Sequence, residues 1–107
     1  MSRFADVLGR LTATIEARKG ADPTSSWTAK LLAMPQLVGA KVMEEAGETV
    51  EAAEEGDNDH LAAESADLIY HWLVLLQAAG VETSAVAAKL AAREGRSGID
   101  EKAARPK

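Results

Sequence analysis

Two segments of the 107-residue chain each carry a pair of carboxylates three residues apart. Glu45 and Glu48 form the first pair, and Glu64 and Asp67 form the second. Residues at this spacing lie on one face of a helix, so two such helices packed antiparallel would point four carboxylates into one small volume. Unpaired negative charges at close range repel one another. Because hard oxygen ligands favour small divalent cations, the spacing predicts a site for Mg²⁺ or Mn²⁺.

The alternative interpretation of these carboxylates is an ordinary solvated helix face, which is where most acidic residues on helices belong. The second pair argues against it. Glu64 and Asp67 lie in a segment rich in Leu, Ile, Trp and Tyr, where a charge is costly unless it is compensated. Two matched pairs on neighbouring helices therefore favour a metal site.

The elements that must position these pairs are helices, because the apolar residues follow helical spacing. The first helix is expected over about 3–18, with Phe4, Val7, Leu8, Leu11 and Ile15 on its apolar face. A second, short helix should follow the N-cap hydroxyls of residues 24–28, and for Trp27 and Leu31 we expect packing in the core rather than the alternative, stacking on a base.

The acidic pairs fall on the next two predicted helices. The first runs from Pro35 to about Glu55, with a buried stripe of Val38, Val42, Ala46, Val50 and Ala53. The second runs from near Asp59 to Gly80, with a core side of Leu61, Leu68, Trp72, Leu75 and Leu76 and a polar stripe of His60, Glu64, Asp67 and His71. A last helix, capped by Thr83, should direct Val86 and Leu90 inward. The prediction is an all-α, small antiparallel helical bundle.

Composition predicts one domain, residues 1–107, in which 93–107 form a basic tail. Apolar residues make up 47% of the chain, but aromatic residues only 4%, and alanine supplies much of the rest. The core must therefore be thin. Small helical chains of this kind gain burial by self-association, so we expect a homodimer or a higher homo-oligomer to complete the bundle.

Charge and composition also argue against several classes of protein and several kinds of site. A net charge of -5 argues against a general nucleic-acid binder, and the absence of cysteine excludes disulfides, thiolate metal sites and cysteine nucleophiles. The N-terminus lacks the apolar run of a signal peptide, and no segment has the roughly 20 apolar residues of a membrane span. We therefore expect a cytoplasmic protein without a membrane partner.

Other residues have two open interpretations. His71 is either a hydrogen-bonded core histidine or a substrate contact, and Lys41 is either a surface ion pair or a contact to a phosphate held by the metal. The basic tail, which includes Arg96 and Lys102, is either solvated or a clamp for phosphates.

The acidic set resembles a known signature. Glu45-x-x-Glu48, fifteen intervening residues and Glu64-x-x-Asp67 are similar to the metal-binding motif of the all-α nucleotide pyrophosphohydrolases, the MazG-like superfamily. Residues 27–32, 41–50, 64–71 and 96–103 resemble the phosphoribosyl-ATP pyrophosphatase family of histidine biosynthesis more narrowly. Two departures are visible: Trp27 replaces the family's usual tyrosine, and Met34-Pro35 replaces a glycine-containing turn.

This resemblance implies hydrolysis of phosphoribosyl-ATP, a small-molecule nucleotide, to phosphoribosyl-AMP and pyrophosphate. It implies Mg²⁺ ligation, with Mn²⁺ as a substitute, by Glu45, Glu48, Glu64 and Asp67. We expect catalytic roles for Glu45 and Glu44. Glu44 is not assigned to the metal, so its carboxylate could act as a general base or hydrogen-bond to the metal ligands. Phosphate contacts are expected from Lys41, and more weakly from Lys30 and the tail.

Three competing functions use the same acidic residues. A house-cleaning pyrophosphatase would act on non-standard or deoxynucleoside triphosphates. A di-iron bundle would need Glu-x-x-His motifs, and neither histidine has a glutamate three residues before it. A non-catalytic helical module would present its acidic faces to a basic partner.

Overall fold

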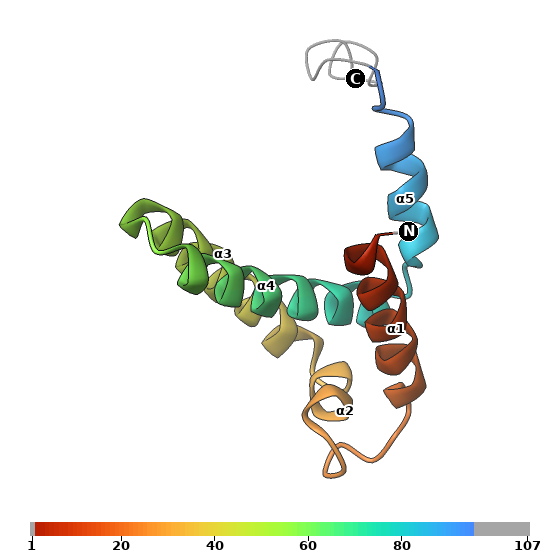
Figure 1. Cartoon of the computed structure of the whole chain (residues 1–107). Helices are drawn as coiled ribbons and strands as arrows, with labels where there is room; N and C mark the ends of the chain where they lie inside the picture. Colours follow the sequence, from red (N-terminus) through yellow and green to blue (C-terminus); the bar gives the residue numbers. More distant parts are fainter. Residues whose placement is uncertain (1, 96–107) are drawn as a thin grey trace, which may run out of the picture.

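The computed structural model describes residues 2–95, and its regular elements are all helices (Figure 1). They are α1 (Arg3–Arg18), α2 (Trp27–Leu32), α3 (Pro35–Glu55), α4 (Asn58–Ala79) and α5 (Thr83–Ala91). The all-α prediction is confirmed. Residues 96–107, which include the predicted phosphate contacts Arg96 and Lys102, lie outside the described residues.

Local capping chemistry sets most helix ends. The side chains of Ser2, Ser26 and Asp57 accept hydrogen bonds from backbone N–H groups at the starts of α1, α2 and α4. Pro35 stands in the first turn of α3, where its missing N–H leaves no bond unmade. Gly56 ends α3 with a left-handed φ of 75°, which glycine adopts without steric cost.

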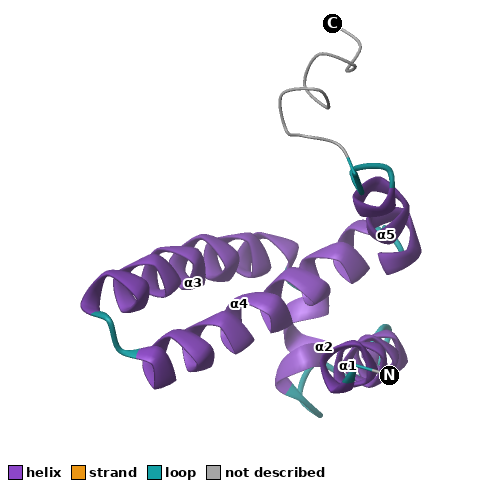
Figure 2. Ribbon diagram, turned by 45° about the horizontal axis from the view of Figure 1, so that its top comes forward, coloured by secondary structure: helices purple, strands orange, loops and turns teal. Residues whose placement is uncertain are grey.

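α3 and α4 form an antiparallel hairpin, and α1 and α2 pack against only one end of it (Figure 2). The buried core lies at that end, where Ile15 of α1, Leu31 of α2 and Val38 of α3 meet Leu73 and Val74 of α4. The other end of the hairpin projects beyond α1 and α2. That projecting end carries the acidic pairs.

The buried stripe of α3 differs from the predicted one. Val50 and Ala53 are exposed, whereas Val38, Glu45 and Ala52 are buried. Positions 38, 42, 45, 49 and 52, which are four, three, four and three residues apart, are buried or half-buried, so the inward face includes Glu45 and Thr49 and leaves out Val50. The prediction failed because it followed apolar residues alone, and a carboxylate occupies one of the inward positions.

The core side of α4 also differs from the prediction. His71, Leu73 and Val74 are its buried residues, while the predicted Leu61, Leu68, Trp72, Leu75 and Leu76 are only half-buried. α4 contacts α1, α2 and α3 on different sides, so its C-terminal half has no single core face. The C-terminal half of such a central helix is apolar nearly all round, so the spacing of its apolar residues does not single out one buried face.

α5 does not cover the core. It runs away from the α3–α4 hairpin on the side where α1 begins (Figure 1). Thr83 is the first residue of this helix, Glu82 precedes it, and no side chain caps it, so the predicted Thr83 cap is wrong. Leu90 is 58% exposed, contrary to prediction, while Val86 is half-buried. Phe4 and Val7 at the start of α1 are exposed as well.

Within the described residues, no single helix is both long and apolar enough to cross a bilayer. α4 and α5 meet the length and composition criteria only when taken together, and a bend of 111° separates them.

Candidate metal centre

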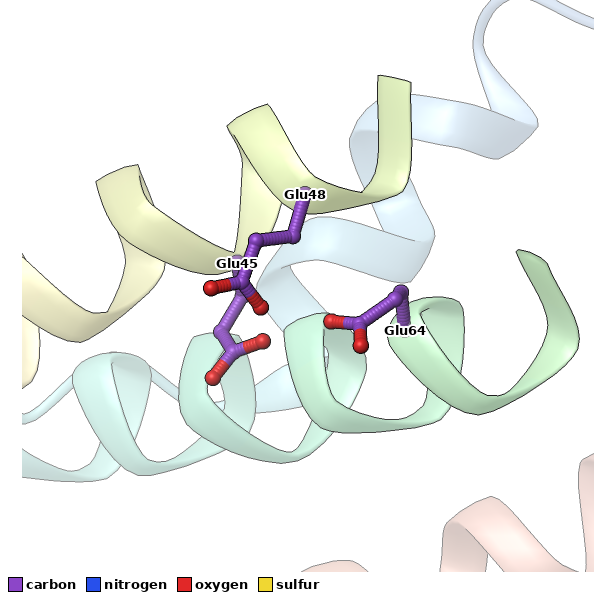
Figure 3. Close-up of side chains that lie close together, drawn as sticks. All are labelled: Glu45, Glu48 and Glu64. Carbon is purple, nitrogen blue, oxygen red and sulfur yellow. The ribbon is translucent and has the colours of Figure 1, made fainter. Parts of the chain in front are cut away.

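Three carboxylates converge in the projecting part of the α3–α4 hairpin (Figure 3). Glu45 and Glu48 extend from one face of α3, and Glu64 extends toward them from α4. One carboxylate oxygen from each lies within 4.8 Å of the other two. The hairpin brings them together because Glu48 and Glu64 are equally far along the chain from Gly56, so an antiparallel pairing places them opposite each other.

Glu45 is the most buried of the three, with 8% of its surface exposed. Burial raises the pKa of its carboxyl group to about 7, and a hydrogen bond with Glu64 and the negative charges of Glu48 and Asp67 add to the rise. Without a cation, the site therefore retains a proton near neutral pH because its carboxylates cannot all ionise together.

The residues fit a divalent cation. The Oε2 atoms of Glu45 and Glu64 are buried and lack a hydrogen-bond partner. Buried polar atoms are normally satisfied, so two unpartnered carboxylate oxygens in one cluster indicate a missing positive partner. Oxygen ligands from carboxylates are the set that Mg²⁺ and Mn²⁺ prefer.

Asp67 borders this cluster without joining the three convergent oxygens. Its side chain is exposed on α4, although its charge is close enough to Glu45 to raise that residue's pKa. A rotation of the exposed side chain would be needed for it to share a cation with the other three. Its predicted ligand role remains a prediction.

Two basic side chains, His60 and Lys41, form ion pairs with carboxylates of the same hairpin. His60 lies between two carboxylates, with Nε2 3.3 Å from Glu64 Oε1 and Nδ1 3.5 Å from Glu55 Oε2. Partial burial acts to lower the pKa of His60, but the two carboxylates outweigh this effect and raise it. Lys41 Nζ lies 3.4 Å from Glu44 Oε2 on the exposed side of α3. Glu44 is thus outside the three-carboxylate cluster, and its predicted catalytic role remains a prediction.

His71 supports the α4 backbone beside the centre. Only 7% of its surface is exposed, and its Nδ1 lies 2.8 Å from the carbonyl oxygen of Asp67. Its Nε2 is also buried and has no partner among the described residues. The structure therefore shows a buried histidine in which one ring nitrogen is hydrogen-bonded and the other is not, and the substrate contact expected of His71 remains a prediction.

Comparison with known proteins identifies the family. The model of the family described as "Phosphoribosyl-ATP pyrophosphohydrolase" matches residues 8–94, which include the acidic cluster and all five helices but the first residues of α1. The chain belongs to this family. The narrower family resemblance, which rests on residues 27–32, 41–50, 64–71 and 96–103, is confirmed.

Several curated relatives carry the name phosphoribosyl-ATP pyrophosphatase. One from Caulobacter sp. (strain K31) is 64% identical over 106 residues, covering 99% of both chains. One from Caulobacter vibrioides (strain NA1000 / CB15N) is 64% identical over 103 residues, covering 96% of both. One from Ruegeria pomeroyi is 57% identical over 102 residues, covering 94% of this chain and 97% of the relative.

Sequence reasoning missed two features of this pyrophosphohydrolase-family chain. His60 was expected only as a member of the polar stripe, without a role, yet it contacts Glu64, and the offset of four residues between them was the available signal. Trp27 was expected to pack in the core, but it is 46% exposed, with Lys30 beside it. No sequence signal separates an exposed from a buried tryptophan at a helix start.

Proposed function

We propose that this chain hydrolyses phosphoribosyl-ATP to phosphoribosyl-AMP and pyrophosphate, the second step of histidine biosynthesis, with the help of Mg²⁺ or Mn²⁺. Family membership over 8–94 supports the substrate and the reaction. The convergence of Glu45, Glu48 and Glu64 within 4.8 Å is the single observation that supports metal assistance.

Glu45, Glu48 and Glu64 would hold the cation, and Asp67 would join them by turning its exposed carboxylate inward. A bound divalent cation supplies charge neutralisation at the polyphosphate and increases the acidity of a coordinated water. The burial of Glu45 keeps bulk water away from one side of the cluster, which strengthens electrostatic interactions there.

Residues around the cluster would handle the phosphates and the proton. Lys41 is held near the site by its ion pair with Glu44, and its ammonium group can exchange that carboxylate for a phosphate oxygen. Glu44, which is exposed, would accept a proton from the attacking water. His60 orients Glu64 through the contact between Nε2 and Oε1.

Pyrophosphate release from phosphoribosyl-ATP, measured with Mg²⁺ and with excess chelator beside a panel of deoxynucleoside triphosphates, tests this function. We expect Mg²⁺-dependent release that is far faster with phosphoribosyl-ATP than with any member of the panel. Faster turnover of the panel would indicate a house-cleaning pyrophosphatase. Absence of both turnover and Mg²⁺-dependent stabilisation would indicate a non-catalytic interaction module.

We also propose that the chain works as a homodimer or a larger homo-oligomer. The exposed apolar residues Phe4, Val7 and Leu90 lie on α1 and α5, outside the buried core. A groove of about 400 Å³, lined by residues of α1, α4 and α5 that include Leu8, Trp72 and Val86, adjoins them. A second copy would bury this surface and add to a small core.

A further inference from the structure

An open groove lies against α2, away from the three carboxylates. Its volume is about 640 Å³, and Pro23, Thr24, Ser26, Trp27, Lys30, Ala33 and Met34 line it. Small-molecule sites commonly span about 300 to 1,000 Å³ and combine an apolar lining with a few polar groups. This groove has that character, because one ammonium group and two hydroxyls accompany an apolar wall.

Trp27 and Lys30 give the groove a specific chemistry. Trp27 is 46% exposed as a residue, and Lys30 Nζ lies over its ring, 5.7 Å from the ring centroid. Nearly half of the surface of Trp27 therefore remains accessible to a ligand, next to a positive charge. Among the described residues, no carboxylate lies within ion-pair distance of Lys30, and the nearby Asp22 accepts hydrogen bonds from Thr24 instead. A planar ring that carries a phosphate is the complementary ligand.

The groove is fixed relative to the acidic centre. Thr28, the residue after Trp27, is joined to Tyr70 of α4 by a hydrogen bond of 2.6 Å between their hydroxyl oxygens. Tyr70 stands one helical turn beyond Asp67, so α2 is attached to the same helix that supplies Glu64. A substrate that reaches from the carboxylates to α2 would contact two helices that this hydrogen bond joins.

We propose that the α2 groove binds the phosphoribosyladenine part of the substrate, with Trp27 stacking on the purine and Lys30 contacting the phosphate of the phosphoribosyl arm. The inference rests on the proposed function. In phosphoribosyl-ATP the purine lies between the triphosphate and the phosphoribosyl group, so one molecule presents phosphates at both ends. The acidic centre handles the triphosphate end, and the groove recognises the end that ATP lacks. Trp27 and Lys30 thereby determine specificity without taking part in the chemistry.

Steady-state kinetics of Trp27→Phe, Trp27→Leu and Lys30→Met test the groove, with Lys89→Met on α5 as the matched control. Base stacking on an aromatic ring and a charged hydrogen bond each correspond to about a tenfold or greater change in affinity. We expect Trp27→Leu and Lys30→Met each to raise KM for phosphoribosyl-ATP about tenfold while kcat stays within about twofold. Trp27→Phe should keep most of the affinity because it keeps an aromatic face, and Lys89→Met should behave as wild type.

Calorimetric titration with phosphoribosyl-AMP and AMP provides a readout that does not depend on turnover. Wild type should bind phosphoribosyl-AMP more tightly than AMP, and Lys30→Met should remove most of that preference. Unchanged KM in Trp27→Leu and Lys30→Met would overturn the groove assignment. So would conversion of the oligomer to monomer by Trp27→Leu in sedimentation velocity, since the groove would then be a subunit interface.

The two proposals fail in different ways. A wild-type protein that releases no pyrophosphate from phosphoribosyl-ATP would refute the proposed function. The other outcome is a wild-type protein that turns over phosphoribosyl-ATP while the groove variants keep the wild-type KM and the wild-type preference for phosphoribosyl-AMP. That result would refute only the assignment of the groove as a substrate-binding site.

Discussion

Glu45 is the residue on which the acidic centre depends. It occupies an inward position of α3, between Val42 and Thr49, where an apolar side chain would add to the contact with α4. Its carboxylate is instead buried beside Glu48 and Glu64, an arrangement that destabilises the fold unless a proton or a cation compensates the charge. This cost is understandable if the position serves ligand binding.

Amide substitution tests the ligand set directly. Glu48→Gln and Glu64→Gln should each lower kcat/KM by about 100-fold or more, because changes to groups that merely support metal ligands already cost about 10- to 100-fold. Helical content should not change, since the amide has the same shape. Glu54→Gln on the same helix, which is exposed and outside the cluster, is the control. Near-normal Mg²⁺-dependent activity in either ligand variant would refute the assignment.

The raised pKa of Glu45 predicts how the metal-free protein responds to pH. Its pKa is 4.5 in an unperturbed carboxyl group and about 7 in the fold, so between these values the folded state binds more protons than the unfolded state. The free energy of unfolding contributed by this group is therefore fully present below about pH 4.5 and falls as pH rises through about 7.

Urea denaturation in chelator, at fixed protein concentration, measures this effect. The stability of wild type relative to Glu45→Gln should decline from pH 5 to pH 8, a range chosen to span the pKa of about 7. The comparison with Glu45→Gln removes the contribution of His60, whose raised pKa also makes stability fall with rising pH. If the difference in free energy of unfolding between wild type and Glu45→Gln stayed constant across this range, the metal-free site would not retain a proton on Glu45 as described. Added Mg²⁺ should reduce the decline by replacing the proton.

The α3–α4 hairpin is the element that assembles the centre. Its connection consists of Gly56, in the left-handed region, and Asp57, which caps α4 by accepting a hydrogen bond from the N–H of His60 at 3.0 Å. Because the connection is this short, the pairing of Glu48 with Glu64 is decided by the turn. A change in the turn would alter the register of both acidic pairs.

Gly39 inside α3 and Gly56 just after it should respond to substitution in opposite directions. Gly56→Ala should lower the free energy of unfolding by about 1 kcal/mol, because its φ of 75° is strained for any residue with a Cβ. Gly39→Ala should raise it by about 0.5 to 1 kcal/mol, because Gly39 is inside the helix and an added Cβ meets nothing within 4 Å. Urea denaturation measures both. Asparagine tolerates the left-handed region, so the free energy of unfolding of Gly56→Asn should be close to that of wild type. A large decrease in this variant would show that backbone strain is not the reason the turn needs glycine.

At the scale of the whole molecule, the core is confined to one end of the hairpin. Five buried apolar side chains form it, and apolar residues of α1 and α5 remain exposed beyond it. Such a distribution is typical of a chain whose hydrophobic surface is completed by another subunit.

Sedimentation velocity over a range of protein concentrations tests self-association. Wild type should sediment as a dimer or larger, and Leu90→Glu on α5 should shift the protein toward monomer by at least about tenfold in dissociation constant, because it places a charge in an apolar interface. Met43→Glu, at an exposed apolar residue of α3, is the matched control and should leave the assembly unchanged. Dissociation by Met43→Glu but not by Leu90→Glu would place the interface elsewhere.

The sequence alone predicted the features that depend on local chemistry. Helical periodicity and cap residues such as Ser26 and Gly80 placed the helices to within a few residues, because capping and backbone freedom act between near neighbours. The pairing of Glu45 with Glu48 and of Glu64 with Asp67 predicted the acidic set for the same reason. A family resemblance then supplied the reaction.

Only the tertiary structure decided which side of each helix faces inward and how far each carboxylate extends. Apolar residues on α3 suggested a stripe that continues through Val50 and Ala53, yet those two residues are exposed, and Glu45 and Ala52 are buried instead. The same geometry left Asp67 at the edge of the cluster and Trp27 exposed. These outcomes depend on contacts between helices distant along the chain, which local periodicity does not contain.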